Sequence, residues 1–146
     1  MFPGRALRMP PEEAAHLLFD AIRPGWASEI APGDIIVGGA HFGMGSARPV
    51  GTLLRLVGVG AVLAASMSSL FQRNCINAGL LALPVPGSAS LCSEGDVLDI
   101  DAERGTVRNL TSGTEVTIPP IPAFVSEIIA SGGIVAQLIK GGYLRE

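Results

Sequence analysis

GDIIVGGAHFGMGSARPVG, residues 33–51, is the stretch that decides the fold of this chain. Ile35–Val37 is a continuous β-branched run, typical of a buried strand, and the turn signal at Gly33-Asp34 precedes it. A glycine-rich loop follows, and Pro49 opens a segment whose apolar residues recur at helical spacing, as at Leu53, Leu54 and Val57. The stretch therefore predicts a strand, a loop and a helix in succession.

The pattern repeats immediately downstream. Gly58 and Gly60 end the predicted helix, Ala61–Ala65 has the composition of a second strand, and 68–78 predicts a second helix that Gly79 ends. Strands that alternate with helices in this way favour parallel strands joined by right-handed crossovers.

The two ends of the chain have a different character. Upstream, Pro10-Pro11-Glu12-Glu13 begins an expected amphipathic helix that continues through Ile22 until Pro24-Gly25. Downstream, 97–100, 105–108 and 115–118 predict a small antiparallel β meander, followed by short helices over 123–130 and 134–139 that Gly132-Gly133 separates. The predicted class is mixed α/β with a β-rich part.

Size and charge limit the possible functions. A chain of 146 residues and 15.0 kDa predicts a single domain over 1–146. The net charge of -3 and scattered Lys and Arg residues do not provide the basic surface that nucleic acid requires. Arg55, two glycines and three serines interrupt the apolar stretch 53–71, which argues against a membrane span. The opening of the chain does not resemble a secretory signal, so we expect a cytoplasmic protein.

The cysteines do not predict a metal site or a disulfide framework. Cys75 and Cys92 are far apart, and neither has a second cysteine or a histidine at metal-ligand spacing. We expect a buried free thiol at each position, and no metal ligands in this chain.

The loop has the composition of an anion site. Gly43, Gly45 and Gly51 allow close backbone approach to a ligand, next to N–H groups at the positive end of a helix dipole. Arg48 adds a planar cation that matches a carboxylate or phosphate, and Ser46 adds a hydroxyl. The loop has neither the P-loop ending nor the dinucleotide fingerprint. In the other interpretation the glycines serve only a tight turn and Arg48 is solvated.

Four ordered motifs resemble one family. Gly33–Val37 matches its GDIIV strand, His41–Arg48 its NFGxGSSR loop, Ala61–Ser66 its AVIA strand, and Arg73–Leu80 its RNxINxGL helix. The chain resembles, over nearly its whole length, the small subunit of isopropylmalate dehydratase, which corresponds to the swivelling fourth domain of aconitase. The resemblance implies a swivelling β/β/α domain.

The resemblance also implies an activity. The family reversibly dehydrates hydroxy di- or tricarboxylic acids, in leucine biosynthesis for isopropylmalate, with a [4Fe-4S] cluster held by a large partner subunit. By this resemblance Ser46 is the catalytic base and Arg48 binds a substrate carboxylate, with Gly45 and Ala47 as further substrate-binding positions. Arg5 matches an arginine of the family's PGRYL segment that can face the substrate. The chain alone is then expected to be inactive.

The chain also departs from the family pattern. Ala47 stands where the family has a second serine, and Pro49-Val50 replace Glu-His. The sequence also begins after the place of the family's D-T-D strand, either from a real truncation or from a misassigned start. These departures motivate an alternative function: a catalytically silent anion-binding or assembly module on the same scaffold.

Other polar residues near the loop have two interpretations each. His41, in the place of an asparagine, is either a new polar contact or a structural loop residue. Asn74 and Asn77 either orient the loop from the neighbouring helix or make local capping bonds. Met44 is expected to pack at an interface.

Overall fold

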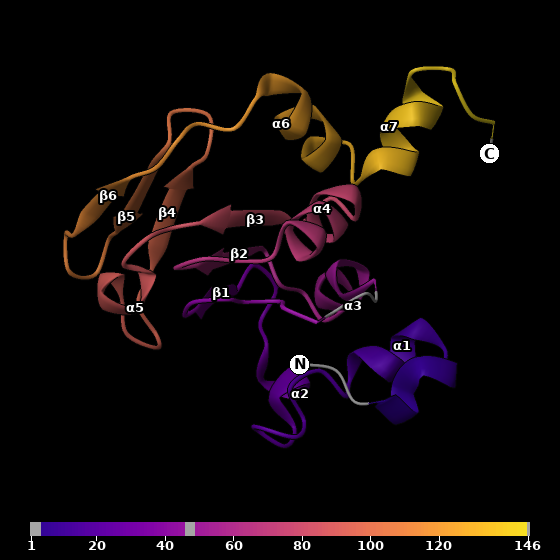
Figure 1. Ribbon diagram of the computed structural model, residues 1–146, viewed down its shortest axis with the longest axis horizontal. Coiled ribbons are helices and arrows are strands. Elements are labelled where there is room, and N and C mark those ends of the chain that lie inside the picture. The colour runs from indigo at the N-terminus through magenta and orange to yellow at the C-terminus, as the bar shows by residue number, and fades with distance from the viewer. Residues whose placement is uncertain (1–3, 46–48, 146) are drawn as a thin grey trace.

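The chain folds into two three-stranded sheets with helices beside them, in a computed structural model that describes residues 4–45 and 49–145 (Figure 1). One sheet is parallel, in the order β1-β2-β3, and the other is antiparallel, in the order β4-β5-β6. The predicted combination of a parallel sheet with a small antiparallel meander is confirmed.

The parallel sheet contains the stretch that opened the sequence analysis. Its strands are β1 (Ile35–Gly38), β2 (Ala61–Ala64) and β3 (Leu81–Pro84), and Ile35 pairs with Ala61, which pairs with Leu81. The crossover helices α3 (Val50–Leu56) and α4 (Ser69–Asn77) pack against each other. Prediction of this β–α–β–α unit was correct, with Pro49 at the N-cap of α3 instead of its first helical position.

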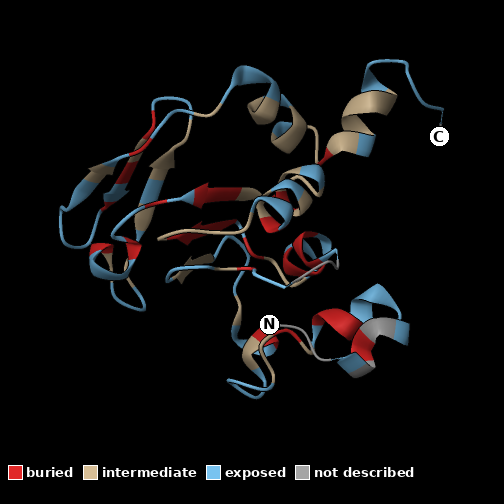
Figure 2. Cartoon of the chain, in the orientation of Figure 1, coloured by how far each residue is buried: buried red, intermediate tan, exposed pale blue. Residues whose placement is uncertain are grey.

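The central strand β2 separates two apolar cores. Val62 packs on the helix side, in a cluster with Leu18, Val50, Leu54 and Phe71, which are all buried. Its neighbour Leu63 points the other way because side chains alternate along a strand, and it joins the cluster between the two sheets. Figure 2 shows β2 buried along its length.

The edge strand β1 differs from the sequence prediction. Ile35–Val37 was expected to be buried, and every residue of β1 is only half-buried. The reason is its place in the sheet: β1 pairs with β2 on one side and with no strand of the described chain on the other.

The meander is held from within by a buried amide. Its strands are β4 (Leu98–Asp101), β5 (Thr106–Asn109) and β6 (Glu115–Thr117). Asn109 is fully buried; its Nδ2 donates to the Leu91 carbonyl (3.0 Å) and to Asp96 Oδ2 (2.7 Å), and its Oδ1 accepts from the backbone N–H groups of Thr111 and Ser112. This amide joins the turn between β5 and β6 to the segment before β4.

The first predicted helix is much shorter than expected. After the 3-10 helix η1 (Gly4–Arg8), α1 runs only from Pro11 to Ala15, and turns occupy most of the segment before α2 (Trp26–Glu29), which was not predicted. Phe19 has a φ of 57°, which ends helical geometry, and its ring packs edge-on against Trp26 with centroids 4.6 Å apart. Aromatic packing therefore overrides the helical periodicity.

Two further elements were missed. The strand β3 and the short helix α5 (Ser88–Leu91) lie where Pro84 and Pro86 obscured the strand pattern. Cys75 is buried and free, as predicted, whereas Cys92 is free but only partly buried, because it lies on the surface segment after α5.

The C-terminal helices α6 (Ala123–Ala130) and α7 (Ile134–Lys140) form as predicted and contain no buried residue. Figure 1 shows α7 at the side of the molecule away from the meander, with α6 between α7 and the meander. No single helix among the described residues has the length and apolar character of a membrane span; this pair meets the test only when taken together, across a bend of 92°.

Candidate functional site

The loop after β1 is fixed by hydrogen bonds to the segment after β2. The Ser66 hydroxyl accepts from the backbone N–H of His41 at 2.9 Å. Phe42 N–H donates to the Ser66 carbonyl, and Ser68 N–H donates to the Phe42 carbonyl, each at 2.9 Å. These bonds extend the pairing of β1 and β2 by a bridge between Phe42 and Met67, so the first half of the loop is a continuation of the sheet.

Ser68 connects the loop to α4. Its hydroxyl donates to the Gly43 carbonyl at 3.2 Å and accepts from the Phe71 N–H at 3.1 Å, which makes Ser68 the N-cap of α4. One side chain therefore positions both the loop and the neighbouring helix. The sequence suggested the start of a helix here, and nothing in it suggested the contact with the loop.

Gly43 allows the loop to lie directly on an aromatic ring. Its φ is +74°, and a Cβ at this position would stand 2.3 Å from Cγ of Phe71. The rings of Phe42 and Phe71 meet edge-on with centroids 5.4 Å apart. Both the conformation and the contact exclude a side chain at Gly43, so this part of the predicted glycine role is structural.

Gly45 has a different environment. Its φ is also +74°, but a Cβ there would meet no atom of residues 4–45 or 49–145 within 4 Å, and the residue is exposed. Its conformation favours glycine, and open space beside it leaves room for a ligand against the backbone. Gly45 is thus the described position of the loop that fits the predicted ligand approach.

On the other side of the loop, α3 begins in tight contact with α4. A Cβ on Gly51 would stand 2.7 Å from Cα of Cys75 and 2.8 Å from the Asn74 carbonyl oxygen. Val50 and Gly51 are buried, and the first turn of α3 contains no acidic residue. From Pro49, the N-cap of α3, the chain thus continues into a closely packed pair of helices.

Several predicted site residues lie outside the described part of the chain. Ser46, Ala47 and Arg48 are the residues between Gly45 and Pro49 that the structure does not describe, so their predicted roles remain predictions. Arg5 belongs to η1, and its side chain is likewise outside the description.

The other candidates have contrasting places. His41 is exposed, with a φ of 58° that is uncommon for a residue other than glycine. The Asn74 backbone lies against the start of α3, next to the loop. Asn77 ends α4, and its carbonyl oxygen lies against Gly133, toward the C-terminal helices. Met44 is 66% exposed, and its expected packing at an interface stays a prediction.

Ionisable groups add little to the described part of the loop. Cys75 lies on α4 where that helix packs against α3. Burial raises the pKa of its thiol to about 12, so the thiol is protonated and unreactive at neutral pH. Within residues 4–45 and 49–145, no three His, Cys, Asp or Glu side chains come together as a metal site would require.

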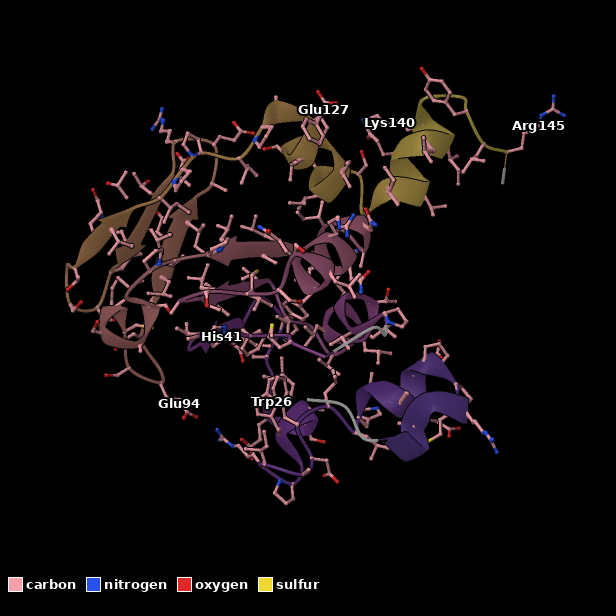
Figure 3. All side chains as sticks on the ribbon, in the orientation of Figure 1. Trp26, His41, Glu94, Glu127, Lys140 and Arg145 are labelled. Carbon is pink, nitrogen blue, oxygen red and sulfur yellow. The ribbon has the colours of Figure 1, made fainter. Side chains whose placement is uncertain are left out.

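The structure also contains an open groove that the sequence analysis did not predict. Its volume is about 890 Å³, and its walls come from α2, β1 and the segment from α5 into β4. Figure 3 labels Trp26 on one wall and Glu94 on the other. Arg23 also lines the groove and forms ion pairs with Glu29 and, at 2.9 Å, with Glu94. Both carboxylates raise the pKa of the Arg23 guanidinium. Phe42, in the loop, also lines the groove.

Comparison with known proteins adds independent evidence. A family model described as the aconitase C-terminal domain matches residues 26–88. The chain is 44% identical over 126 residues to the 3-isopropylmalate dehydratase small subunit of Desulfovibrio desulfuricans, covering 86% of this chain and 73% of the relative. It is 41% identical over 144 residues to 3-isopropylmalate dehydratase small subunit 1 of Thermotoga maritima, covering 96% and 86%.

Two proteins of Methanocaldococcus jannaschii are also similar. An isopropylmalate/citramalate isomerase small subunit is 38% identical over 133 residues, covering 89% of this chain and 78% of the relative. A crystal structure of 3-isopropylmalate dehydratase superimposes with a TM-score of 0.85 at 29% identity, covering 97% of this chain and 84% of that chain.

Proposed function

The chain belongs to the family of 3-isopropylmalate dehydratase small subunits, and we propose that it is the smaller part of a hydro-lyase that reversibly dehydrates a hydroxy di- or tricarboxylic acid. Isopropylmalate is the proposed substrate, because relatives that match most of the chain carry that name. A relative named for both isopropylmalate and citramalate keeps related hydroxy acids within the proposed substrate class.

Ser46 is the proposed catalytic base, whose Oγ takes the proton from the carbon next to a substrate carboxylate. A serine alkoxide is too basic to persist in water, so the position needs backbone N–H donors, a helix start and a nearby cation. Gly45 supplies an exposed, open backbone beside Ser46, and the first turn of α3 has no carboxylate to oppose a negative charge. These features support the assignment.

Arg48 is proposed to bind a substrate carboxylate through its planar guanidinium, and Arg5 to contact the substrate from the N-terminal segment. Gly45 and Ala47 are proposed to contribute backbone contacts. Without a side-chain hydroxyl at Ala47, substrate binding would rely on the arginines and the backbone of this chain.

A large subunit is the proposed partner, and it would hold the [4Fe-4S] cluster that the family resemblance implies. The described residues do not fit such a cluster: they contain no grouping of metal-binding side chains, and the buried Cys75 is protonated. The proposed contribution of this chain is therefore to hold the substrate and to accept a proton, and the chain alone should be inactive.

The observation that carries this proposal is the rigid frame around the undescribed residues. Bonds to Ser66 and Ser68 fix the loop before Gly45, and the contact of Gly51 with α4 fixes the chain after Pro49. Ser46 and Arg48 follow this part of the loop in the sequence, and a fixed frame is what a positioned base and a carboxylate-binding cation require, which supports the proposal.

The test is a Ser46→Ala variant in the complex with the large subunit. Dehydration of isopropylmalate, followed by the absorbance of the alkene product, should fall about 10²- to 10⁴-fold while assembly is unchanged, because a positioned base contributes on that order. Ser28→Ala, at an exposed position on α2, is the matched control and should keep full activity. Full activity in Ser46→Ala would reject Ser46 as the base.

The alternative, a catalytically silent anion-binding or assembly module, makes the opposite prediction. Calorimetry of the isolated chain with small dicarboxylates would show tight binding in that case, whereas a site that a partner completes binds weakly when halved. The replacement of Glu-His by Pro49-Val50 is the observation that favours this alternative.

A further inference from the structure

The guanidinium of Arg55 lies where the ends of two other helices meet. Arg55 is in the last turn of α3, and its Nη1 donates to the carbonyl of Ala78 and, at 2.7 Å, to the carbonyl of Gly132. Ala78 is the C-cap of α4, and Gly132 directly follows Ser131, the C-cap of α6. One side chain of α3 therefore joins the ends of α4 and α6.

Both carbonyls lie at the negative ends of helix dipoles. The last carbonyls of a helix have no partner within the helix, and a cation at that end is stabilising. Hydrogen bonds from a charged donor are also stronger than those between neutral groups. Arg55 thus supplies a donor and a positive charge to each helix end, and an apolar side chain in its place would supply neither.

Glycines bring these two helix ends together. A Cβ on Gly79 would stand 2.5 Å from the carbonyl carbon of Gly132, and a Cβ on Gly133 would stand 2.5 Å from the carbonyl oxygen of Asn77. Figure 1 shows α4 between α3 and the junction of α6 with α7. Backbone therefore lies directly against backbone, and one nitrogen of Arg55 reaches a carbonyl on each side.

The bonds of Arg55 limit α3 in a way that packing does not. Gly51 and Leu54 are buried on the inner face of α3, whereas Arg55 and Leu56 are exposed on its outer face. Apolar contacts are non-directional and keep α3 close to α4, but hydrogen bonds depend on direction. The bonds of Arg55 therefore also fix how α3 is rotated against the end of α4.

The same two helices hold both ends of the candidate loop. The Ser68 hydroxyl, at the start of α4, donates to the carbonyl of Gly43, and α3 begins at Val50, on the other side of the undescribed residues. Ser46 lies between these two points in the sequence. A change in how α3 lies against α4 would therefore change the distance and direction between the two ends of the segment that contains Ser46.

We infer that Arg55 is a positioning residue for the dehydration, because it bonds the end of α3 to the ends of α4 and α6 and so maintains the arrangement of the loop that proton removal requires. The inference rests on the proposed function, in which Ser46 is the base. Arg55 acts through the helices: α3 has seven residues and is about 10 Å long, and Arg55 is at the end away from the loop.

The test compares Arg55→Met and Arg55→Lys in the complex with the large subunit, with that subunit in saturating amount. Arg55→Met loses the donors and the charge, and kcat for isopropylmalate should fall at least about fivefold, because a small displacement of a base is costly. Both bonds of Arg55 come from one nitrogen, and a lysine ammonium has three donors, so Arg55→Lys should keep at least about half of the wild-type kcat.

Two control variants accompany these measurements. Arg104→Met makes the same chemical change in the exposed turn between β4 and β5, away from the three helices, and should keep the wild-type kcat. Val107→Ala removes buried apolar volume from the meander and destabilises the chain without changing a contact of Arg55.

A deuterium isotope effect separates positioning from loss of folded protein. Isopropylmalate with deuterium at the carbon that loses its proton reports on the proton transfer itself. A displaced base slows this transfer relative to the other steps, so the isotope effect on kcat should be larger in Arg55→Met than in the wild type. In Val107→Ala the isotope effect should equal that of the wild type, even if less of the protein is folded.

Other results overturn the inference. An unchanged kcat in Arg55→Met, or a lower kcat with the wild-type isotope effect, would reject positioning by Arg55 and leave the proposed function intact. Equal losses in Arg55→Lys and Arg55→Met would reject the role of the two hydrogen bonds. An Arg55→Met chain that no longer binds the large subunit would assign Arg55 to assembly instead. If the wild-type complex dehydrates no hydroxy acid, the proposed function is wrong and the inference fails with it.

Discussion

The two sheets of this chain are stabilised in different ways. In the parallel unit, β2 is buried on both faces and glycines bring backbone into direct contact with neighbouring elements, as Gly43 does with Phe71 and Gly51 with Cys75. In the meander, β5 alternates between buried and less buried residues, and the buried amide of Asn109 holds the turns. The candidate site belongs to the unit held by close packing, where small changes in volume are costly.

The largest expected difference concerns two glycines with nearly the same backbone conformation. Gly43→Ala combines a left-handed φ of +74° with a clash against Phe71 and should cost about 2–5 kcal/mol in the free energy of unfolding. Gly113→Ala, in the meander, has a φ of +79° and open space, and should cost about 1–2 kcal/mol. Urea unfolding of both variants measures the contrast, and equal losses would contradict it.

The meander should be most sensitive at its buried amide. Asn109→Ala leaves the Leu91 carbonyl and the N–H groups of Thr111 and Ser112 without their partner, and should cost about 2–4 kcal/mol in the free energy of unfolding. Glu103→Ala, an exposed change in the same sheet, should stay within about 0.5 kcal/mol. A loss below about 1 kcal/mol for Asn109→Ala would show that the amide does not organise the turns.

A smaller effect is expected at the anchor of the loop. Ser68→Ala removes the N-cap of α4 and the bond to Gly43, and should lower the free energy of unfolding by about 1 kcal/mol. Turnover of the assembled complex should also fall, because the loop loses a contact that positions it. Ser69→Ala, the exposed next residue, is the control, and its activity should equal that of the wild type. An unchanged turnover for Ser68→Ala would show that Ser68 caps α4 without positioning the candidate site.

The smallest effect concerns pH and is confined to the meander. Hydrogen bonds from the Ser93 N–H and the Asn109 side chain hold the pKa of Asp96 below its ordinary value. The contribution of this carboxylate to stability is therefore present above its ordinary pKa and is lost as the pH falls below about 4. Thermal unfolding at a series of pH values should show a flatter acid limb for Asp96→Asn than for the wild type.

Prediction from the sequence succeeded where local patterns and packing agree. The β–α–β–α unit was predicted because turn glycines, a proline and apolar periodicity all place its boundaries in the same positions, and the meander because its strands follow turn signals. It failed for the helix expected through Ile22, where the contact of Phe19 with Trp26 competes with the periodicity. It also missed β3, whose end at Pro84 is acceptable only because β3 is the edge of the sheet.

For the candidate site, the position of the loop was predictable and its support was not. The sequence of residues 35–48 shows the order of strand, glycines, serine and arginine. Its glycines also indicate a left-handed backbone near Gly43 and Gly45, as the structure has it. The hydrogen bonds of Ser66 and Ser68 join segments about 25 residues apart in the sequence, and no local sequence pattern predicts such contacts.

By itself, the sequence determined the class of the fold, the family resemblance and the place of the glycine-rich loop, because these depend on the order and spacing of residues along the chain. Only the tertiary structure decided that β1 is a half-buried edge strand, that Gly43 lies on Phe71, and that the edges of β1 and β4 border one groove. The physical reason is that an edge, a contact or a groove is a relation between segments distant in sequence, and packing alone determines which segments meet.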